Sequence, residues 1–286
     1  MNQIVSNVSP RPTQFHSATG LRAPLNFIRR QDSKPVTHSA ALTGTSPRHF
    51  FKTEAHEVLI EDMRGIAGSL SLDREGFKLL GFETEVEDLY DDDAVRQRYY
   101  PEIESLLRRE LGASRVIVFD ATRRSDNGIG ARNPDGLRGP AGRVHVDYTV
   151  KSGPRRLEDL VGEAEATRLA DTGSRIVQVN VWRPIHGPVE RSPLALADAS
   201  SVDARDLIAT DQVFADRVGE IYHLAYDPSQ RWYYAPLMTR NEVLLIKGWD
   251  SLEDGRAQFT PHSAFDPLHV SDDAPPRESI EVRTFA

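Results

Sequence analysis

His145 and Asp147 are the two residues of this sequence whose types and spacing most directly suggest chemistry. They lie within residues 143–149, where β-branched and aromatic side chains favour a strand. Side chains two residues apart on a strand project to the same side, so this imidazole and this carboxylate would enter one space. Together they offer a nitrogen and an oxygen ligand to a metal ion. Such a spacing is common by chance, and a structural role for His145 is the competing interpretation.

A metal site built on this pair needs a further ligand from elsewhere in the chain. The sequence has nine histidines and no cysteine, which excludes thiolate zinc sites, iron–sulfur clusters, disulfides and cysteine nucleophiles. His262 is the best candidate, because it lies in a turned segment, residues 259–265, just before the last predicted strand. His269 is its main rival, and His223, in another predicted strand, could face the same cavity. Two histidines and one carboxylate form the facial triad that binds Fe(II) in non-haem oxygenases.

Arg277 and Ser279 form a second candidate site, a short distance along the chain from His262. On an extended chain both side chains face the same side. A planar guanidinium and a hydroxyl would clamp a carboxylate, as the distal carboxylate of 2-oxoglutarate requires. Arg283 lies further along the same predicted strand and is the alternative clamp. The competing interpretation of Arg277 is a surface ion pair, for example with Glu278, which would contribute little to stability.

Two charged residues lie inside otherwise apolar predicted strands. Arg183 follows Trp182 and cannot be buried without a partner, so it would bind an anionic group of the substrate or cosubstrate, or pair with an internal carboxylate. For Trp182, core packing is favoured over a platform for substrate. Lys247, within residues 243–249, is expected to be an edge lysine whose ammonium group reaches solvent, with a pocket carboxylate as the alternative partner.

The elements that must position these residues are mostly strands. A helix is predicted where Ile103, Leu106, Leu107 and Leu111 form one apolar face that ends at Gly112, and a second helix is predicted over residues 157–170. Strands separated by turns, with helices gathered in the first half, indicate a mainly β fold with supporting helices, as in a β-sandwich or barrel. Alternating or β-branched patterns predict strands at residues 56–62, 115–120, 143–150, 175–182, 220–225, 232–234, 242–249 and 279–285.

A glycine-rich loop, residues 123–142, leads into the strand that carries His145. Gly128 and Gly130 begin like a dinucleotide-binding motif, but the third glycine position holds Asn133 and no helix pattern follows. A nucleotide-binding fold is therefore not supported. We expect a flexible lid that excludes water from the site.

Composition and charge limit the class of protein. Apolar residues make up 39% and charged residues 27% of the chain, as in ordinary globular proteins. The formal net charge of −8 argues against nucleic-acid and anionic-membrane partners. No apolar run is long enough to cross a membrane and the start lacks a signal-peptide pattern, so a cytoplasmic protein is expected. The oligomeric state is left open, with a homodimer as one outcome.

The first 45 residues differ from the rest in composition. They are rich in Ser, Thr, Pro, Arg and Asn and show no sustained periodicity. The sequence therefore predicts an extended N-terminal arm over residues 1–45, ordered structure from near Phe50, and one catalytic domain over residues 46–286.

Several of these motifs together resemble the Fe(II)/2-oxoglutarate-dependent oxygenases, and in particular the family of fungal gibberellin desaturases, fungal secondary-metabolite hydroxylases and the cephamycin methoxylation component. The resemblance runs from about residue 50 to the end, and the matching segments are residues 62–65, 75–77, 143–149, 180–184, 260–265 and 277–283. It implies a double-stranded β-helix, or cupin-like jelly roll, around one iron ion held by His145, Asp147 and His262. It also implies that 2-oxoglutarate and O₂ are converted to succinate and CO₂, while a small natural-product-like substrate is hydroxylated, desaturated or cyclised.

Two other functions stay open from the sequence. One is a cupin-like metal protein without oxygenase turnover, or an accessory component of a two-protein tailoring system. The other is a small-molecule binding protein that has kept the fold and lost the metal. The intact ligand set argues against the second, because a pure binding protein has no need of an unpaired carboxylate in its cavity. The sequence does not identify the substrate.

Overall fold

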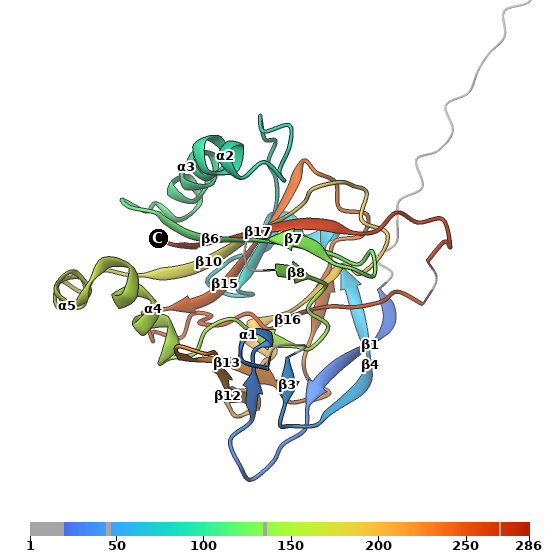
Figure 1. The fold of residues 1–286 in the computed structure, drawn as a ribbon, viewed down its shortest axis with the longest axis horizontal. Coiled ribbons are helices and arrows are strands. Elements are labelled where there is room, and N and C mark those ends of the chain that lie inside the picture. Colours follow the sequence, from blue (N-terminus) through green and yellow to red (C-terminus); the bar gives the residue numbers. More distant parts are fainter. Residues whose placement is uncertain (1–19, 44–46, 134–135, 269) are drawn as a thin grey trace, which may run out of the picture.

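The computed structural model describes residues 20–43, 47–133, 136–268 and 270–286, and it consists mainly of two curled sheets that face each other (Figure 1). A ten-stranded sheet has the order β1-β4-β14-β11-β16-β9-β13-β12-β2-β3, and a five-stranded sheet has the order β5-β15-β10-β17-β6. Strands β7 and β8 form a separate two-stranded ribbon. The mainly β architecture with supporting helices agrees with the sequence-based expectation.

The larger sheet carries the predicted metal ligands. Its strands are β1 (Leu21–Ile28), β2 (Val36–His38), β3 (Arg48–His49), β4 (Thr53–Asp62), β9 (His145–Val146), β11 (Leu194–Ala197), β12 (Leu207–Val213), β13 (Val218–Leu224), β14 (Trp232–Tyr234) and β16 (His262–Ala264).

The smaller sheet forms the opposite wall. Its strands are β5 (Phe77–Gly81), β6 (Ile117–Ser125), β10 (Val177–Pro184), β15 (Glu242–Asp250) and β17 (Glu278–Phe285), and the ribbon consists of β7 (Ala131–Asn133) and β8 (Gly136–Arg138). The helices are α1 (Ala40–Thr43), α2 (Asp92–Ala94), α3 (Tyr100–Leu111), α4 (Ser152–Val161) and α5 (Glu163–Asp171), with short 3-10 turns at Met63–Ser69, Ala199–Ser201 and Ala204–Asp206 and a π-helical turn at Val95–Tyr99.

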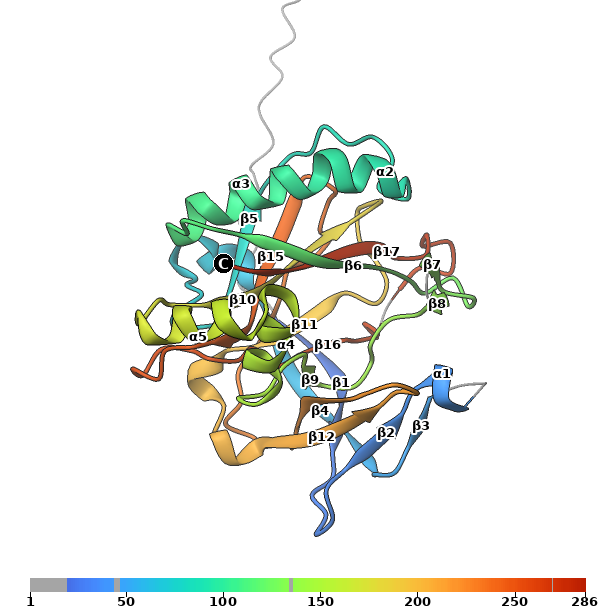
Figure 2. The same cartoon turned by 60° about the vertical axis from the view of Figure 1, so that its left-hand side comes forward.

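Helix α3 covers the outer face of the smaller sheet (Figure 2). Ile103, Leu106 and Leu107 on its apolar face are fully buried, as the helical spacing predicts. Gly112 ends the helix in the left-handed conformation, with φ 65°, where a glycine has no steric cost. The predicted helix is therefore confirmed with its predicted C-cap.

Strand β10 runs through the middle of the smaller sheet, and its side chains alternate as predicted. Val179 and Val181 pack in the cluster that contains helix α3. Gln178, Asn180 and Trp182 point the other way, and all three are buried. Because this face looks toward the larger sheet, its polar side chains lie in the space between the two sheets.

Strand β1 corrects the prediction that ordered structure begins near Phe50. It pairs antiparallel with β4 along its whole length and buries Ala23, Leu25 and Phe27 on one side. Pro24 is tolerated because β1 is an edge strand, where a missing N–H breaks no ladder on the outer side. Of the predicted arm, only residues from Gly20 onward can be compared, because residues 1–19 lie outside the described part of the chain.

Three other predicted elements differ from the structure. The helix predicted over residues 157–170 is two helices, α4 and α5, separated at Gly162, whose φ is 84°. The strand predicted over residues 143–150 is only β9, and Asp147 lies just beyond its end. Part of the glycine-rich loop forms the β7–β8 ribbon, which lies beside β6.

No helix in the described residues is long and apolar enough to cross a membrane.

Candidate metal centre

The structure brings together the three side chains that the sequence selected. His145, Asp147 and His262 each offer one ligand atom, and these three atoms lie within 4.8 Å of one another. His145 and His262 face each other as register partners on the antiparallel strands β9 and β16, with ring centroids 4.6 Å apart. Nε2 of His145 lies 3.5 Å from Oδ1 of Asp147. The two imidazoles and one carboxylate thus converge from one side on a common point.

Hydrogen bonds to the backbone fix which ring nitrogens are free. Nδ1 of His145 lies 2.8 Å from the carbonyl oxygen of Arg143, and Nδ1 of His262 lies 3.0 Å from that of Thr260. A carbonyl can only accept, so each Nδ1 carries the hydrogen and each Nε2 keeps its lone pair for a metal. Burial lowers the pKa of His262 to about 4, so this imidazole is neutral at physiological pH, as a metal ligand must be.

Asp147 is held as a carboxylate with one oxygen left for the metal. Its Oδ2 accepts hydrogen bonds from Nδ2 of Asn180 at 2.8 Å and from Nε of Arg283 at 3.0 Å. Burial by itself would raise the pKa of Asp147, but the Arg283 guanidinium holds it well below its usual range. Two neutral imidazole nitrogens and one ionised carboxylate oxygen are the donor set that Fe(II) takes in facial-triad sites.

Arg277 has the properties of an anion-binding residue. Its side chain is only 2% exposed, and Nη1 donates to the carbonyl oxygen of Ser192 at 2.8 Å. Its Nε and Nη2 are buried and have no hydrogen-bond partner among the described residues. Burial lowers the pKa of Arg277 to about 10, so it still carries its charge at neutral pH. Ser279, also buried, lies two residues further along the chain, at the start of β17.

Unlike Arg277, Arg283 has partners for each of its guanidinium nitrogens. Besides Asp147, it contacts Asp120 at 2.7 Å, Glu281 at 2.6 Å and the hydroxyl of Thr122 at 3.1 Å. Its guanidinium is therefore already surrounded by carboxylates and fixes the orientation of Asp147. This arrangement disfavours Arg283 as the alternative carboxylate clamp.

Arg183 lies apart from this site, and its contacts differ from the internal carboxylate that the sequence left open as one of two alternatives, beside an anionic group of the substrate or cosubstrate. It is fully buried on the α3 side of β10, where Nε donates to the hydroxyl of Tyr99 at 2.9 Å. Its other nitrogens donate to the carbonyl oxygens of Arg240 and Phe82 at 2.5 and 2.7 Å. Because side chains alternate along a strand, Arg183 lies on the opposite face of β10 from Asn180. Backbone carbonyl dipoles stabilise its charge there, and its role is structural.

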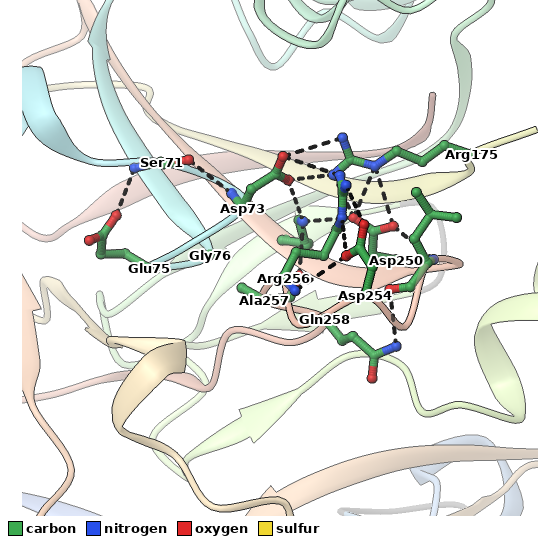
Figure 3. Close-up of polar contacts among 12 residues, drawn as sticks. Ser71, Asp73, Glu75, Gly76, Arg175, Asp250, Asp254, Arg256, Ala257 and Gln258 are labelled. Atoms are coloured by element: carbon green, nitrogen blue, oxygen red, sulfur yellow. Dashed lines mark hydrogen bonds and ion pairs between the residues drawn. The ribbon is translucent and has the colours of Figure 1, made fainter.

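Lys247 does not reach solvent, and the prediction of an edge lysine is wrong. It is 0% exposed, and its Nζ donates to Asp73 at 3.0 Å, to Asp250 at 2.7 Å and to the carbonyl oxygen of Ala257 at 2.9 Å. Arg175 pairs with both carboxylates, and Arg256 pairs with Asp73 (Figure 3). We call Asp73, Arg175, Lys247, Asp250 and Arg256 the ionic cluster.

The ionic cluster anchors the segment that ends in His262. The backbone N–H of Ala257 donates to the carbonyl oxygen of Asp73 at 2.8 Å. Further along the same segment, the hydroxyl of Thr260 donates to the carbonyl oxygen of Gly76 at 2.7 Å. Since Thr260 also accepts the Nδ1–H of His262, the cluster and the turn at Gly76 together determine where this imidazole lies.

Among the described residues, His223 does not add a ligand. His223 is buried beside His145 on β13, and its Nδ1 lies 3.0 Å from the hydroxyl of Thr210. It is not part of the three-residue cluster found in the described residues. His269 lies outside the described residues, so the structure does not compare it with His262.

Sequence reasoning missed the residues that orient the ligands. Asn180 holds Asp147, and Gln178 donates to Oδ1 of Asn180 at 2.6 Å. The available signal was two amides on alternate positions of a strand that is mostly apolar and wholly buried. That pattern marks a polar network inside the fold, although it does not name the partner.

A cavity of about 710 Å³ opens next to Arg277. Two of its lining residues, Asp126 and Ser192, contact Arg277 directly: Asp126 accepts the backbone N–H at 2.7 Å, and Ser192 accepts from the side chain. Its walls also come from Gly139 and Pro140, shortly before His145, and from Asp266 and Pro267, shortly after His262. The cavity therefore lies beside Arg277, but Arg277 itself and the three candidate ligands are not among its lining residues.

Comparison with known proteins defines the class. A sequence profile described as "Oxidoreductase/YMDC permease-like domain" matches residues 25–286. Proteins named as Fe(II)/2-oxoglutarate-dependent dioxygenases and as hydroxylases or desaturases align with more than two thirds of the chain at 30% identity or above. The chain belongs to this family: it is an Fe(II)/2-oxoglutarate-dependent oxygenase.

Two relatives and one solved structure illustrate the similarity. Hydroxylase/desaturase efuI of Hormonema carpetanum is 33% identical over 280 residues, which cover 91% of this chain and 92% of the relative. The Fe(II)/2-oxoglutarate-dependent dioxygenase nvfI of Aspergillus novofumigatus is 32% identical over 82% of this chain and 84% of its own length. A solved structure of the iron and alpha-ketoglutarate-dependent endoperoxidase NvfI superimposes with a TM-score of 0.83 at 28% identity and covers 94% of this chain and 98% of that chain. The predicted jelly-roll fold is thereby confirmed.

Proposed function

We propose that this enzyme hydroxylates, desaturates or cyclises a small natural-product-like molecule at an iron ion held by His145, Asp147 and His262. When bound, iron(II) supplies the centre at which O₂ oxidises 2-oxoglutarate to succinate and CO₂ and so generates the oxidant for a substrate C–H bond. The chain's own contribution is to hold the cosubstrate, to orient the ligands and to shape the cavity for the substrate.

The observation that carries the proposal is the pair of unused donors on Arg277. A buried guanidinium nitrogen without a partner costs free energy, so a side chain with two of them is suited to an anion that arrives later. A carboxylate fits the planar fork of Nε and Nη2, and the Ser279 hydroxyl is available as a third donor. We therefore propose Arg277 and Ser279 as the residues that bind the distal carboxylate of 2-oxoglutarate.

Asp126 and Ser192 preorganise this clamp. Oδ1 of Asp126 accepts the backbone N–H of Arg277, while its Oδ2 accepts from the hydroxyl of Ser192 at 3.0 Å and from Arg191 at 3.2 Å. The carbonyl oxygen of Ser192 in turn holds Nη1 of Arg277. Because Nη1 is fixed in this way, the guanidinium cannot rotate its free edge away from an incoming carboxylate.

The cavity beside the clamp supports a small-molecule substrate. Its volume of about 710 Å³ lies within the usual range for small-molecule sites, and its lining mixes Ile129, Pro267 and Val270 with Asp126 and Asp266. The segment with Gly128 and Gly130 borders the cavity, which supports the sequence-based expectation of a lid. A cytoplasmic location stays a prediction from the sequence, and so does the absence of nucleic-acid or membrane partners, which the net charge favours.

Turnover with 2-oxoglutarate tests the proposal. The purified protein, given Fe(II), 2-oxoglutarate and air, should form succinate, and a true substrate should accelerate that reaction and appear as an oxidised product. The measurement is succinate formed per enzyme, with nitrogen in place of air as the control. Protein that binds iron and 2-oxoglutarate but forms no succinate would contradict the proposal and favour a metal protein without oxygenase turnover.

A further inference from the structure

Gly248 is the extra residue of a β-bulge directly opposite the buried end of Gln178. In the pairing of β10 with β15, Gln178 lies opposite Trp249 and Val179 lies opposite Lys247, so Gly248 has no partner. A bulge re-aims side chains locally, and bulges are frequent next to active sites.

The amides of Asn180 and Gln178 can be oriented from their partners. The Asp147 carboxylate only accepts hydrogen bonds, so the NH₂ group of Asn180 must face it. The carbonyl oxygen of Asn180 then faces Gln178, whose NH₂ group donates to it at 2.6 Å. The carbonyl oxygen of Gln178 is left pointing away, buried and without a partner among the described residues.

The space into which that oxygen points exists because residue 248 is a glycine. A Cβ on Gly248 would lie 1.8 Å from Oε1 and 3.0 Å from Cδ of Gln178, which is far inside the contact distance. Gly248 is not among the glycines with a positive φ, so alanine meets no backbone penalty there. The atom in the way is the end of a side chain, so alanine at this position would displace the Gln178 amide.

We infer that Gly248 and Gln178 are positioning residues for the metal centre. The bulge at Gly248 makes room for the Gln178 amide. That amide fixes Asn180, and Asn180 in turn orients Asp147. Asn180 and Arg283 both hold Oδ2, so Oδ1 is left to bind the metal. This inference rests on the proposed function, in that Asp147 is taken as a metal ligand. Partners of ligands commonly alter metal affinity 10–100-fold when they are removed.

Metal affinity of the apoprotein tests the inference without any turnover. Co(II) is titrated anaerobically, and both the dissociation constant and the visible Co(II) spectrum are recorded. We expect Asn180→Ala to weaken binding about 10–100-fold, and Gly248→Ala and Gln178→Ala to weaken it in the same direction with a changed Co(II) spectrum. Gly81→Ala is the matched control, because it lies at the end of β5 in the same sheet and a Cβ there meets nothing within 4 Å.

A double-mutant cycle distinguishes an effect of Gly248→Ala through the Gln178 amide from a general loss of stability. If Gly248→Ala acts by displacing the Gln178 amide, it should have no further effect in a Gln178→Ala background. Wild-type affinity and spectrum in Gly248→Ala, or an equal loss with and without Gln178, would overturn the inference. If Gly248→Ala does not fold, Gln178→Ala alone decides, and wild-type affinity in that variant overturns it too. A wild-type protein that binds no Co(II) and no Fe(II) would instead overturn the proposed function.

Discussion

His145 and His262 lie directly opposite each other on β9 and β16, although more than a hundred residues separate them in the sequence. Each presents Nε2 toward the other because each Nδ1–H is held by the carbonyl oxygen two residues earlier in the chain. The two imidazoles therefore reach the site by the same local geometry, repeated on two neighbouring strands.

The first prediction concerns the three ligands. His145→Ala, Asp147→Ala and His262→Ala should each abolish Fe(II) binding at micromolar concentration, because two protein ligands do not make a facial site. Equilibrium dialysis of the apoprotein against Fe(II) under nitrogen measures this. His269→Ala, which alters the rival named from the sequence, should bind iron as the wild type does. Loss of iron in that variant, with iron retained in His262→Ala, would show that the ligand assignment is wrong.

The second prediction separates the two arginines of the β17 region. Arg277→Leu should raise the 2-oxoglutarate concentration at half-saturation about tenfold or more, because it removes charge-assisted hydrogen bonds of about 1.5–3 kcal/mol each. Its iron affinity should stay unchanged.

Arg283→Leu should do the reverse, because its guanidinium holds Asp147. Iron affinity should fall, and saturation by 2-oxoglutarate of the enzyme that retains iron should be nearly normal. Both constants are obtained by titrating each variant, first with Fe(II) and then with 2-oxoglutarate. If the two variants exchanged these phenotypes, Arg283 would be the clamp.

The third prediction concerns the ionic cluster. Lys247→Met should destabilise the fold by about 3 kcal/mol and lower Tm by roughly 6–12 °C, because it leaves buried Asp250 with fewer donors. Thermal unfolding followed by circular dichroism measures this. Arg205→Gln, which removes an exposed ion pair with Asp203, is the control and should leave Tm unchanged. An unchanged Tm in Lys247→Met would mean that the cluster does not stabilise the fold.

The fourth prediction is the acid dependence of the same cluster. Burial by itself raises the pKa values of Asp73 and Asp250, but hydrogen bonds from Arg175 and Lys247 outweigh it and hold both below their usual range. A carboxylate whose pKa is lower in the folded chain than in the unfolded chain stabilises the fold. That stabilisation is complete above the pKa in the unfolded chain, about 3.9, and is lost as the pH falls through the pKa in the folded chain.

Urea unfolding at a series of pH values below about 4 measures this contribution. The free energy of unfolding should fall with acid in the wild type, and it should fall less steeply in Lys247→Met, where the pKa values are less depressed. Equal slopes in the two proteins would contradict the role assigned to Lys247.

Local patterns in the sequence predicted much of the fold. The apolar face of α3 and the alternation of β10 are read directly from residues three to four or two apart, and the structure has both. The prediction that His145 and Asp147 point to the same side also rests on residues only two positions apart. The choice of His262 depended on its place before the last strand and on a resemblance to a family, since no local pattern brings two distant strands together.

The errors have physical causes that the sequence hides. Lys247 and Arg183 both lie in buried strands, and their partners, Asp73 and Tyr99, come from distant segments. Without knowledge of these distant partners, a charged side chain in a strand is predicted to reach solvent or to bind a ligand. Strand β1 was missed because Pro24 and the polar composition around it obscured the alternation of apolar residues on an edge strand.

The most direct test of the central claim is an anaerobic titration of the apoprotein with Fe(II) and then with 2-oxoglutarate. We predict a weak visible metal-to-ligand charge-transfer band that appears only when both are present. The band should be absent in Asp147→Ala and should require more 2-oxoglutarate in Arg277→Leu. A wild-type protein that binds iron at these residues but gives no band at saturating 2-oxoglutarate would contradict the account.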